Sequence, residues 1–151
     1  MVWWVAKLKN QRMKILDDLW VEFILCWMIF DAYLTEISKS GTDRKKLDYF
    51  YQNDSELKSY MLSQPEALCG YGETLKTYEL VVNMRPGAGD NAGKVVMNTE
   101  SLEEILEVIY QIRCNLFHGS KNIKNSRDYE LVKIGKNFLR RFFIDTWMTG
   151  I

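Results

Sequence analysis

The sequence predicts an all-α protein, a helical bundle with a long glycine-rich loop around residues 85–98. Three observations support this fold class. Apolar residues recur at helical spacing near both ends of the chain, Ser and Thr residues stand where helices would begin, and several glycines gather in one stretch between them. The length of 151 residues suits one domain with its own core, so we expect residues 1–151 to form a single helical domain.

The first helical pattern covers residues 2–38 and allows a break near Asn10. Asp17 and Asp18 suit the first turn of its second segment, because carboxylates are favoured at the positive end of a helix dipole. One face of that segment carries apolar residues at helical spacing: Trp20, Phe23, Ile24, Trp27, Leu34 and Ile37.

Shorter elements follow. Residues 40–43 end the first pattern and supply an N-cap for a short helix over residues 44–51. A serine opens another helix over residues 55–62. Pro65 and the two glycines after it predict a loop over residues 65–72.

Residues 73–84 are ambiguous between two structures. Their apolar spacing permits a helix, which we favour, while β-branched and aromatic residues also suit a strand. Beyond them, residues 86–94 form the glycine-rich loop and residues 95–97 a short extended piece.

Two helices are predicted in the last third of the chain. Ser101 fits an N-cap, and Glu104 completes a capping box for a helix that runs to His118. After a polar connection at residues 122–126, the last helix covers about residues 127–148. Its apolar side consists of Leu131, Ile134, Phe138, Phe142 and Phe143.

Composition limits the class of protein. Lys and Arg number 20, as do Asp and Glu, so the formal net charge is zero, which argues against nucleic-acid binding by overall charge but allows a local basic patch. The three scattered cysteines fit neither a disulfide framework nor zinc spacing and indicate a reducing compartment. The N-terminus is unlike a signal peptide, and the most apolar run, residues 19–34, is too short and too charged to span a membrane. We therefore expect a cytoplasmic protein with no membrane partner.

The glycine-rich loop resembles nucleotide-binding signatures only in part. Its glycine spacing is wrong for a P-loop, and Val95 stands where Ser or Thr would reach magnesium. It also lacks the following helix of a dinucleotide fingerprint. A structural zinc site does not fit a chain with one histidine and no cysteine cluster. The sequence therefore indicates a surface loop, and we expect no cofactor and no metal.

The most informative stretch contains Arg113 and the only histidine of the chain, His118. A fixed positive charge and a group that titrates near neutral pH suit chemistry on a phosphate. On a helical wheel, Arg113 lies in the middle of the apolar stripe of its helix, and Asp31 lies in the middle of the stripe of the first helix. Because charges rarely occupy such positions unpaired, we hypothesise that Asp31 orients Arg113. A purely structural pair is the equal alternative.

His118 falls on the polar side of the same wheel, in line with Cys114 and Gln111. The Arg113 and His118 side chains start about 140° apart, so one helix does not aim both at one atom. Either the arginine reaches round the helix end, or two copies of the helix meet in a homodimer. The alternative is a lone surface histidine.

The residues from Arg113 through Leu-Phe-His118-Gly to Lys121, with the Arg-Asp that begins at Arg127, resemble the signature of the HEPN superfamily. The aromatic segment Phe-Asp31-Ala-Tyr is similar to another part of that pattern. The resemblance implies a small all-α domain that cleaves RNA as a dimer without metal, often in toxin–antitoxin or phage-defence systems. Its partners would be RNA, a second copy, and an antitoxin such as a nucleotidyltransferase-like protein.

The resemblance also implies roles for single residues. Arg113 and His118 would be catalytic, Asn115 would position the phosphate, and Lys121 with Lys124 and Arg127 would bind the flanking backbone, although these three also suit ordinary solvated charges. Cys114 is a departure, because active relatives usually carry a polar residue there that can orient the histidine. The alternative function is a non-catalytic HEPN-like dimer that binds RNA, a nucleotide or a partner protein.

Overall fold

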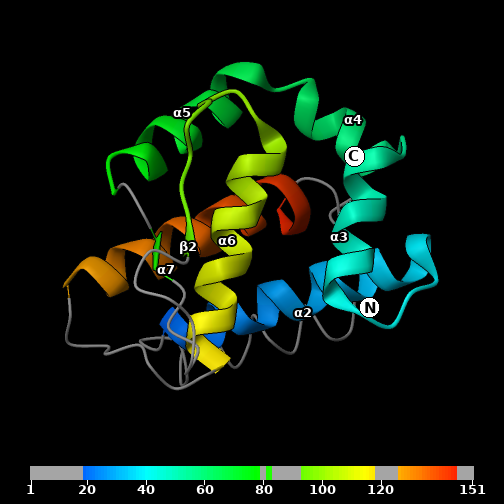
Figure 1. Cartoon of the computed structure of the whole chain (residues 1–151), viewed down its shortest axis with the longest axis horizontal. Helices are drawn as coiled ribbons and strands as arrows, with labels where there is room; N and C mark the ends of the chain where they lie inside the picture. Colours follow the sequence, from blue (N-terminus) through cyan, green and yellow to red (C-terminus); the bar gives the residue numbers. More distant parts are fainter. Residues whose placement is uncertain (1–18, 79–80, 83–92, 118–125, 146–151) are drawn as a thin grey trace.

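Six α-helices and one π-helical turn make up most of the chain that the computed structural model describes, which is residues 19–78, 81–82, 93–117 and 126–145 (Figure 1). The helices are α2 (Leu19–Ser38), α3 (Asp43–Gln52), α4 (Glu56–Leu62), α5 (Pro65–Lys76), α6 (Leu102–Phe117) and α7 (Ser126–Leu139), and the π-helical turn is η1 (Arg140–Ile144). Two short strands, β1 (Val81–Val82) and β2 (Gly93–Lys94), pair antiparallel. The predicted all-α fold is confirmed.

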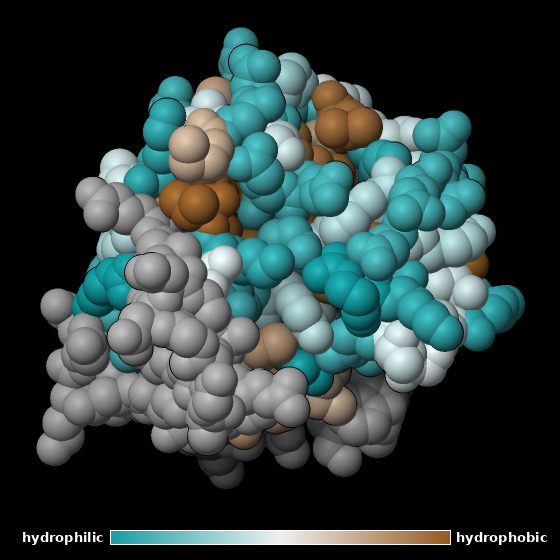
Figure 2. Space-filling view, viewed as in Figure 1, coloured by the Kyte–Doolittle hydropathy of each residue, from teal (hydrophilic) through white to brown (hydrophobic). Residues whose placement is uncertain are grey.

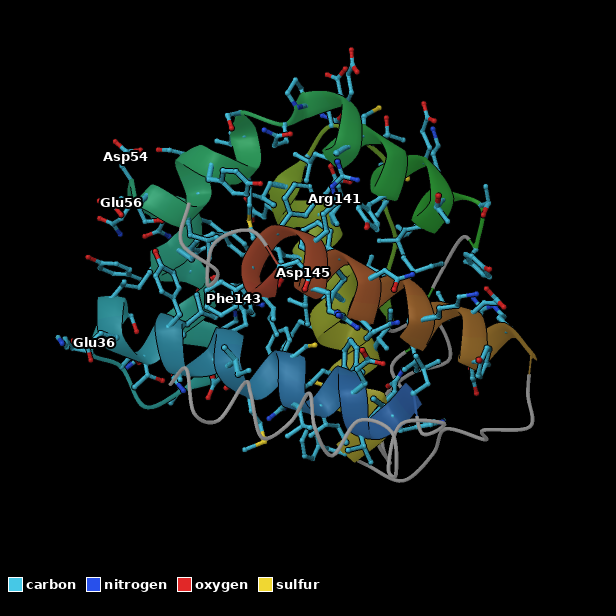
Figure 3. All side chains as sticks on the ribbon, turned by 180° about the vertical axis from the view of Figure 1, so that it is seen from behind. Glu36, Asp54, Glu56, Arg141, Phe143 and Asp145 are labelled. Atoms are coloured by element: carbon cyan, nitrogen blue, oxygen red, sulfur yellow. The ribbon has the colours of Figure 1, made fainter. Side chains whose placement is uncertain are left out.

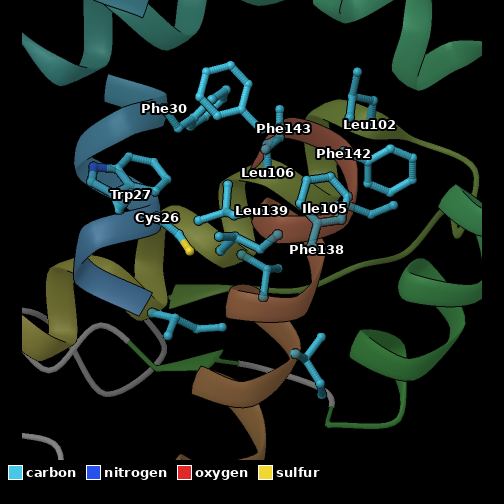
Figure 4. Packing of buried hydrophobic residues seen from close by; sticks show 14 of the residues in the cluster. Cys26, Trp27, Phe30, Leu102, Ile105, Leu106, Phe138, Leu139, Phe142 and Phe143 are labelled. Atoms are coloured by element: carbon cyan, nitrogen blue, oxygen red, sulfur yellow. The ribbon is translucent and has the colours of Figure 1, made fainter. Parts of the chain in front are cut away.

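The core lies where α2 packs along α7 and η1, with α6 crossing them (Figures 1 and 4). Gly135 allows the close approach of α2 to α7, because a Cβ there would lie 2.6 Å from Cε2 of Phe23. Phe143 reaches from η1 to α2, where its ring centroid is 5.8 Å from that of Phe30. The apolar side predicted for the last helix is confirmed, since all five of its residues are buried.

Three predicted helix starts carry side-chain caps. The Thr42 hydroxyl oxygen accepts a hydrogen bond from the backbone N–H of Lys45, and Ser55 and Ser101 accept from the third residue beyond each of them. The capping box of Ser101 is only half formed. The Glu104 carboxylate accepts from the N–H groups of Met97, at 2.8 Å, and Asn98, at 3.2 Å, so it fastens the incoming loop to α6.

The loop predicted over residues 65–72 is wrong, because these residues belong to α5. Pro65 occupies the start of the helix. The backbone N–H groups of a first helical turn have no acceptor within the helix, so the lack of an N–H in proline costs no hydrogen bond there. Gly72 is needed for a close approach and not for a turn, since a Cβ there would lie 2.1 Å from the carbonyl oxygen of Thr99. Both readings of the ambiguous segment are partly right: α5 continues to Lys76, and β1 follows.

Some expectations differ from the structure or fall outside it. Residues 93–94, predicted as the end of the glycine-rich loop, form β2, and the rest of that loop, residues 86–92, lies outside the described residues. The piece predicted as extended, residues 95–97, directly follows β2, and its Val96 is fully buried. The last helix changes into η1, where the N–H of Asp145 donates to the carbonyl of Arg140 at 2.6 Å. The expectations for Asn10, for Asp17 and Asp18, and for the connection at residues 122–125 lie outside the described residues.

The surface of the described residues is mainly hydrophilic in the view of Figure 2, with apolar residues in small separate groups. From the opposite side, Figure 3 shows Glu36, Asp54 and Glu56 at the periphery, whereas the labelled Phe143 lies inside between η1 and α2. None of the helices within the described ranges has the combination of length and apolarity that crossing a membrane requires.

The two glycines of α5 should respond to alanine in opposite directions. Gly72→Ala should lower the free energy of unfolding by about 1–3 kcal/mol, because the new methyl group overlaps the Thr99 backbone. Gly70→Ala is the matched control: nothing lies within 4 Å of its Cβ position, so alanine should raise the stability by about 0.5–1 kcal/mol through its helix propensity. Urea unfolding followed by circular dichroism measures both. Equal effects of the two substitutions would contradict the close approach.

Candidate functional site

The candidate site is built where the first turn of α3 meets the last turns of α6. Asp43, the first residue of α3, lies with its Oδ2 3.2 Å from Nη1 of Arg113 on α6. The two side chains are 24% and 26% exposed for Arg113 and Asp43, so the ion pair is partly shielded from water and still reachable. Thr42 caps the helix just before Asp43, which fixes the direction in which α3 leaves this contact.

The predicted direct pairing of Asp31 with Arg113 is not what the structure has. Asp31 pairs instead with Lys46 of α3, at 3.0 Å, and Lys46 is 4.0 Å from Asp43. The two charges singled out by the helical wheels are therefore joined through α3, in the order Asp31, Lys46, Asp43, Arg113. The physical reason is that α3 presents Lys46 and Asp43 three residues apart on one face, so that each charge has an opposite neighbour.

Aromatic rings hold the Arg113 guanidinium from its own helix. Its central carbon is 4.3 Å from the ring centroid of Phe117 and 5.9 Å from that of Tyr110. The hydroxyl of Tyr110 also donates to Asp43 at 3.4 Å, and burial, followed by a hydrogen bond with Cys114, raises the Tyr110 pKa, so this tyrosine stays protonated. The guanidinium of Arg113 thus contacts Phe117, the residue just before His118.

A second ion cluster fixes α3 on α6 beside the first. Arg44 binds Glu107 with two hydrogen bonds of 2.7 and 3.2 Å, and the Tyr51 hydroxyl donates to the same carboxylate at 2.9 Å. Lys94 of β2 lies 3.6 Å from it. Burial raises the pKa of Glu107, but the hydrogen bonds from Arg44 and Tyr51 outweigh it and leave the pKa below its ordinary value.

Asn115 does not fit the predicted role of a phosphate ligand. Its side chain is fully buried, and its Oδ1 accepts a hydrogen bond from Nε2 of Gln111 at 3.0 Å. Gln111 itself is buried, although the wheel placed it on the polar side. Gln111 and Asn115 therefore belong to the buried face of α6. This helix packs against α5, α7 and both strands. Cys114 is partly buried, with its sulfur 4.0 Å from Nη1 of Arg113.

Of the remaining residues predicted for the site, three lie outside the described residues and one lies within them. His118, Lys121 and Lys124 lie outside the described residues. Arg127 is within them, and its Nη2 donates to the carbonyl of Tyr78 at 2.9 Å, so at least part of its guanidinium serves the fold. Within the described ranges, no group of three His, Cys, Asp or Glu residues gathers closely enough to hold a metal ion.

Sequence reasoning missed Asp43 and misjudged Phe117. Asp43 follows an N-cap, and a carboxylate there is explained by the helix dipole without any distant partner, so no local signal marks it as the counterion of Arg113. On the helical wheel Phe117 belongs to the apolar stripe of the predicted helix, with Leu102, Ile105, Leu106, Ile109 and Leu116, yet it is 54% exposed. Its place in the last turn of α6, with a cation four residues earlier, was the available signal.

Comparisons of the chain with protein-family models, with curated proteins and with solved structures gave no match. The HEPN resemblance therefore depends on the motif residues around Arg113 and His118. Of the two motif residues, Arg113 is among the described residues, and His118 is not.

The Glu107 cluster should make stability depend on pH. Because the folded-state pKa of Glu107 is lowered, its contribution is full above the unfolded-state pKa and is lost as the pH falls through the folded-state pKa. Glu107→Gln should lower the free energy of unfolding by about 1–2 kcal/mol at pH 7, and the difference from the parent should shrink as the pH falls below the ordinary glutamate pKa of 4.5. Glu103→Gln, at an exposed position one turn earlier, is the control and should change little across this range. A Glu107→Gln deficit that stays constant from pH 7 down to the pH at which the parent unfolds would contradict this account.

Proposed function

We propose that the protein is a metal-independent endoribonuclease in which Arg113 and His118 act on the same phosphodiester. The observation that carries the proposal is the placement of Arg113. Its guanidinium pairs with Asp43 and contacts the ring of Phe117, the residue that precedes His118. This contact supports a site in which Arg113 and the end of α6 act together.

The reaction is an internal transfer. The ribose 2′-oxygen attacks the adjacent phosphorus, the bond to the 5′-oxygen breaks, and the products are a 2′,3′-cyclic phosphate and a free 5′-hydroxyl. Charge that develops on the phosphoryl oxygens would be neutralised by Arg113. One proton leaves the 2′-hydroxyl and one joins the 5′-oxygen, and His118 would carry out one of these transfers.

A homodimer would complete this chemistry. Each chain holds one imidazole, while the reaction has two proton transfers, so a second copy would supply the second histidine. The HEPN resemblance further supports a role in a toxin–antitoxin or phage-defence system, with an antitoxin such as a nucleotidyltransferase-like protein as partner and the cytoplasm as the compartment.

Loss of either proposed catalytic side chain should abolish most of the cleavage. In buffer with EDTA, His118→Ala should slow the cleavage of structured RNA by about 10²–10⁴-fold, because a proton transfer loses its group. Arg113→Met should slow it by about 10²–10³-fold, because the phosphoryl charge loses its partner. The measurement is the rate of appearance of 2′,3′-cyclic phosphate ends.

The control for the arginine variant is the double substitution Asp43→Asn with Arg113→Met, which leaves no carboxylate without its cation. If this double variant folds like the parent and is inactive, the loss lies in the chemistry. If the parent itself yields no cyclic phosphate ends, the nuclease proposal fails, and the non-catalytic binding module is the better account.

Asp43 should act as a positioning residue for Arg113. Asp43→Asn keeps the shape of the side chain but weakens the ion pair, so the turnover number should fall about tenfold while KM changes little, because only the placement of the cation is altered. Asp43→Glu should recover part of the turnover, since it restores a carboxylate. Thermal unfolding of both variants separates this effect from loss of folded protein. An Asp43→Glu variant no better than Asp43→Asn would argue against positioning.

A further inference from the structure

We propose that the exposed ring of Phe117 is a stacking surface for an unpaired base of the RNA, next to the phosphate site of Arg113. The choice of RNA as ligand depends on the proposed function, and the inference narrows it to single-stranded substrate.

The exposure of Phe117 is unusual for its helix. Four large apolar residues of α6, Ile105, Leu106, Ile109 and Ile112, are at 0% exposure, and Leu116 is partly buried, whereas Phe117 is 54% exposed. A ring that is half in water at the end of an amphipathic helix contributes little to the core, because the stabilisation from burial scales with the apolar area removed from water.

The ring is nevertheless held in place. Its centroid lies 4.3 Å from the guanidinium carbon of Arg113, and Arg113 is in turn fixed by Asp43. Other large apolar side chains of the described residues are exposed as well, namely Met28, Tyr49, Leu62, Met97 and Tyr129. Among these described residues, Phe117 is the one that lies against a guanidinium. A ring that contacts a held cation and is 54% exposed has room to receive a flat ligand.

A nucleotide with a free base is complementary to this pair of side chains. Its base stacks on an aromatic ring, and its phosphate binds a guanidinium. The faces of the bases are covered in a double helix, so the pair favours single strands, loops or bulges. The chain has 20 basic and 20 acidic residues, so overall attraction to the phosphate backbone is weak and stacking would carry a large share of the affinity.

The test uses the full chain in a His118→Ala background, so that binding is measured without cleavage. The ligand is a fluorescently labelled 12-nucleotide oligouridylate, and the readout is Kd by anisotropy. Phe117→Leu, which keeps an apolar side chain but removes the ring, should weaken binding by about 5- to 150-fold. Phe117→Trp should retain the affinity, because a larger ring stacks as well. Met97→Leu is the matched control at an exposed apolar position just before the N-terminal end of α6, opposite to the end that carries Phe117, and it should leave Kd unchanged.

A second ligand separates stacking from an indirect effect through Arg113. An abasic ribose-phosphate oligomer of the same length has the same phosphates and no bases. If Phe117 stacks on a base, this oligomer should bind weakly to the parent, and Phe117→Leu should change its Kd by less than about twofold. If Phe117→Leu weakens both ligands equally, the ring acts only by holding Arg113, and the inference is overturned.

The outcomes also distinguish this inference from the nuclease proposal. Ring-dependent binding of oligouridylate by a protein whose parent form yields no cyclic phosphate ends would retain the stacking site and reject the nuclease. Cleavage with the same kcat/KM in the parent and in Phe117→Leu would retain the nuclease and reject the stacking site. No measurable binding of oligouridylate, or equal binding of a duplex of the same length, would also reject the stacking site.

Discussion

The arrangement of the candidate site depends on two ion pairs that fasten the first turn of α3 to α6. Asp43 and Arg44 are neighbours in the sequence and opposite in charge, and they bind Arg113 and Glu107, which are opposite in charge as well. An exchange of partners would bring like charges together at both points, Asp43 with Glu107 and Arg44 with Arg113. The pairs therefore specify one register of α3 on α6. Ion pairs of this kind contribute more to such specificity than to the net free energy of unfolding.

Lys46 extends this arrangement into the interior. Its side chain is 9% exposed and lies between Asp31 of α2 and Asp43, so a charge that would be costly alone has two carboxylates beside it. Through Lys46, the placement of Asp43 depends on α2 as well as on α3. The guanidinium of Arg113 on α6 is thus located by α2 and α3, two consecutive helices that come much earlier in the chain, although Asp43 is the one described carboxylate that touches it.

Local patterns in the sequence predicted much of the fold but little of the pairing. The caps at Thr42 and Ser55 and the apolar face of the last helix are confirmed, because each depends on residues within a few positions of one another. Gly72 suggested a loop, and this prediction was wrong. The glycine is required because the Thr99 backbone, from a distant segment, lies against it, and no local pattern in the sequence shows this contact. The wheels correctly marked Asp31 and Arg113 as charges in need of partners, but no wheel contains the helix that supplies those partners.

The same limit explains why the surroundings of Arg113 differ from expectation. A motif identifies which residue types suit a reaction, and it says nothing about which of them the fold buries. Asn115, two residues from Arg113, is enclosed with Gln111, while Phe117, four residues away, is left in water against the cation. Two aromatic rings and one carboxylate restrain the guanidinium and leave the side chain 24% exposed, so little reorganisation would be needed when an anion binds. Restraint combined with access is what a cation needs if it is to act on a phosphate rather than only to neutralise a buried acid.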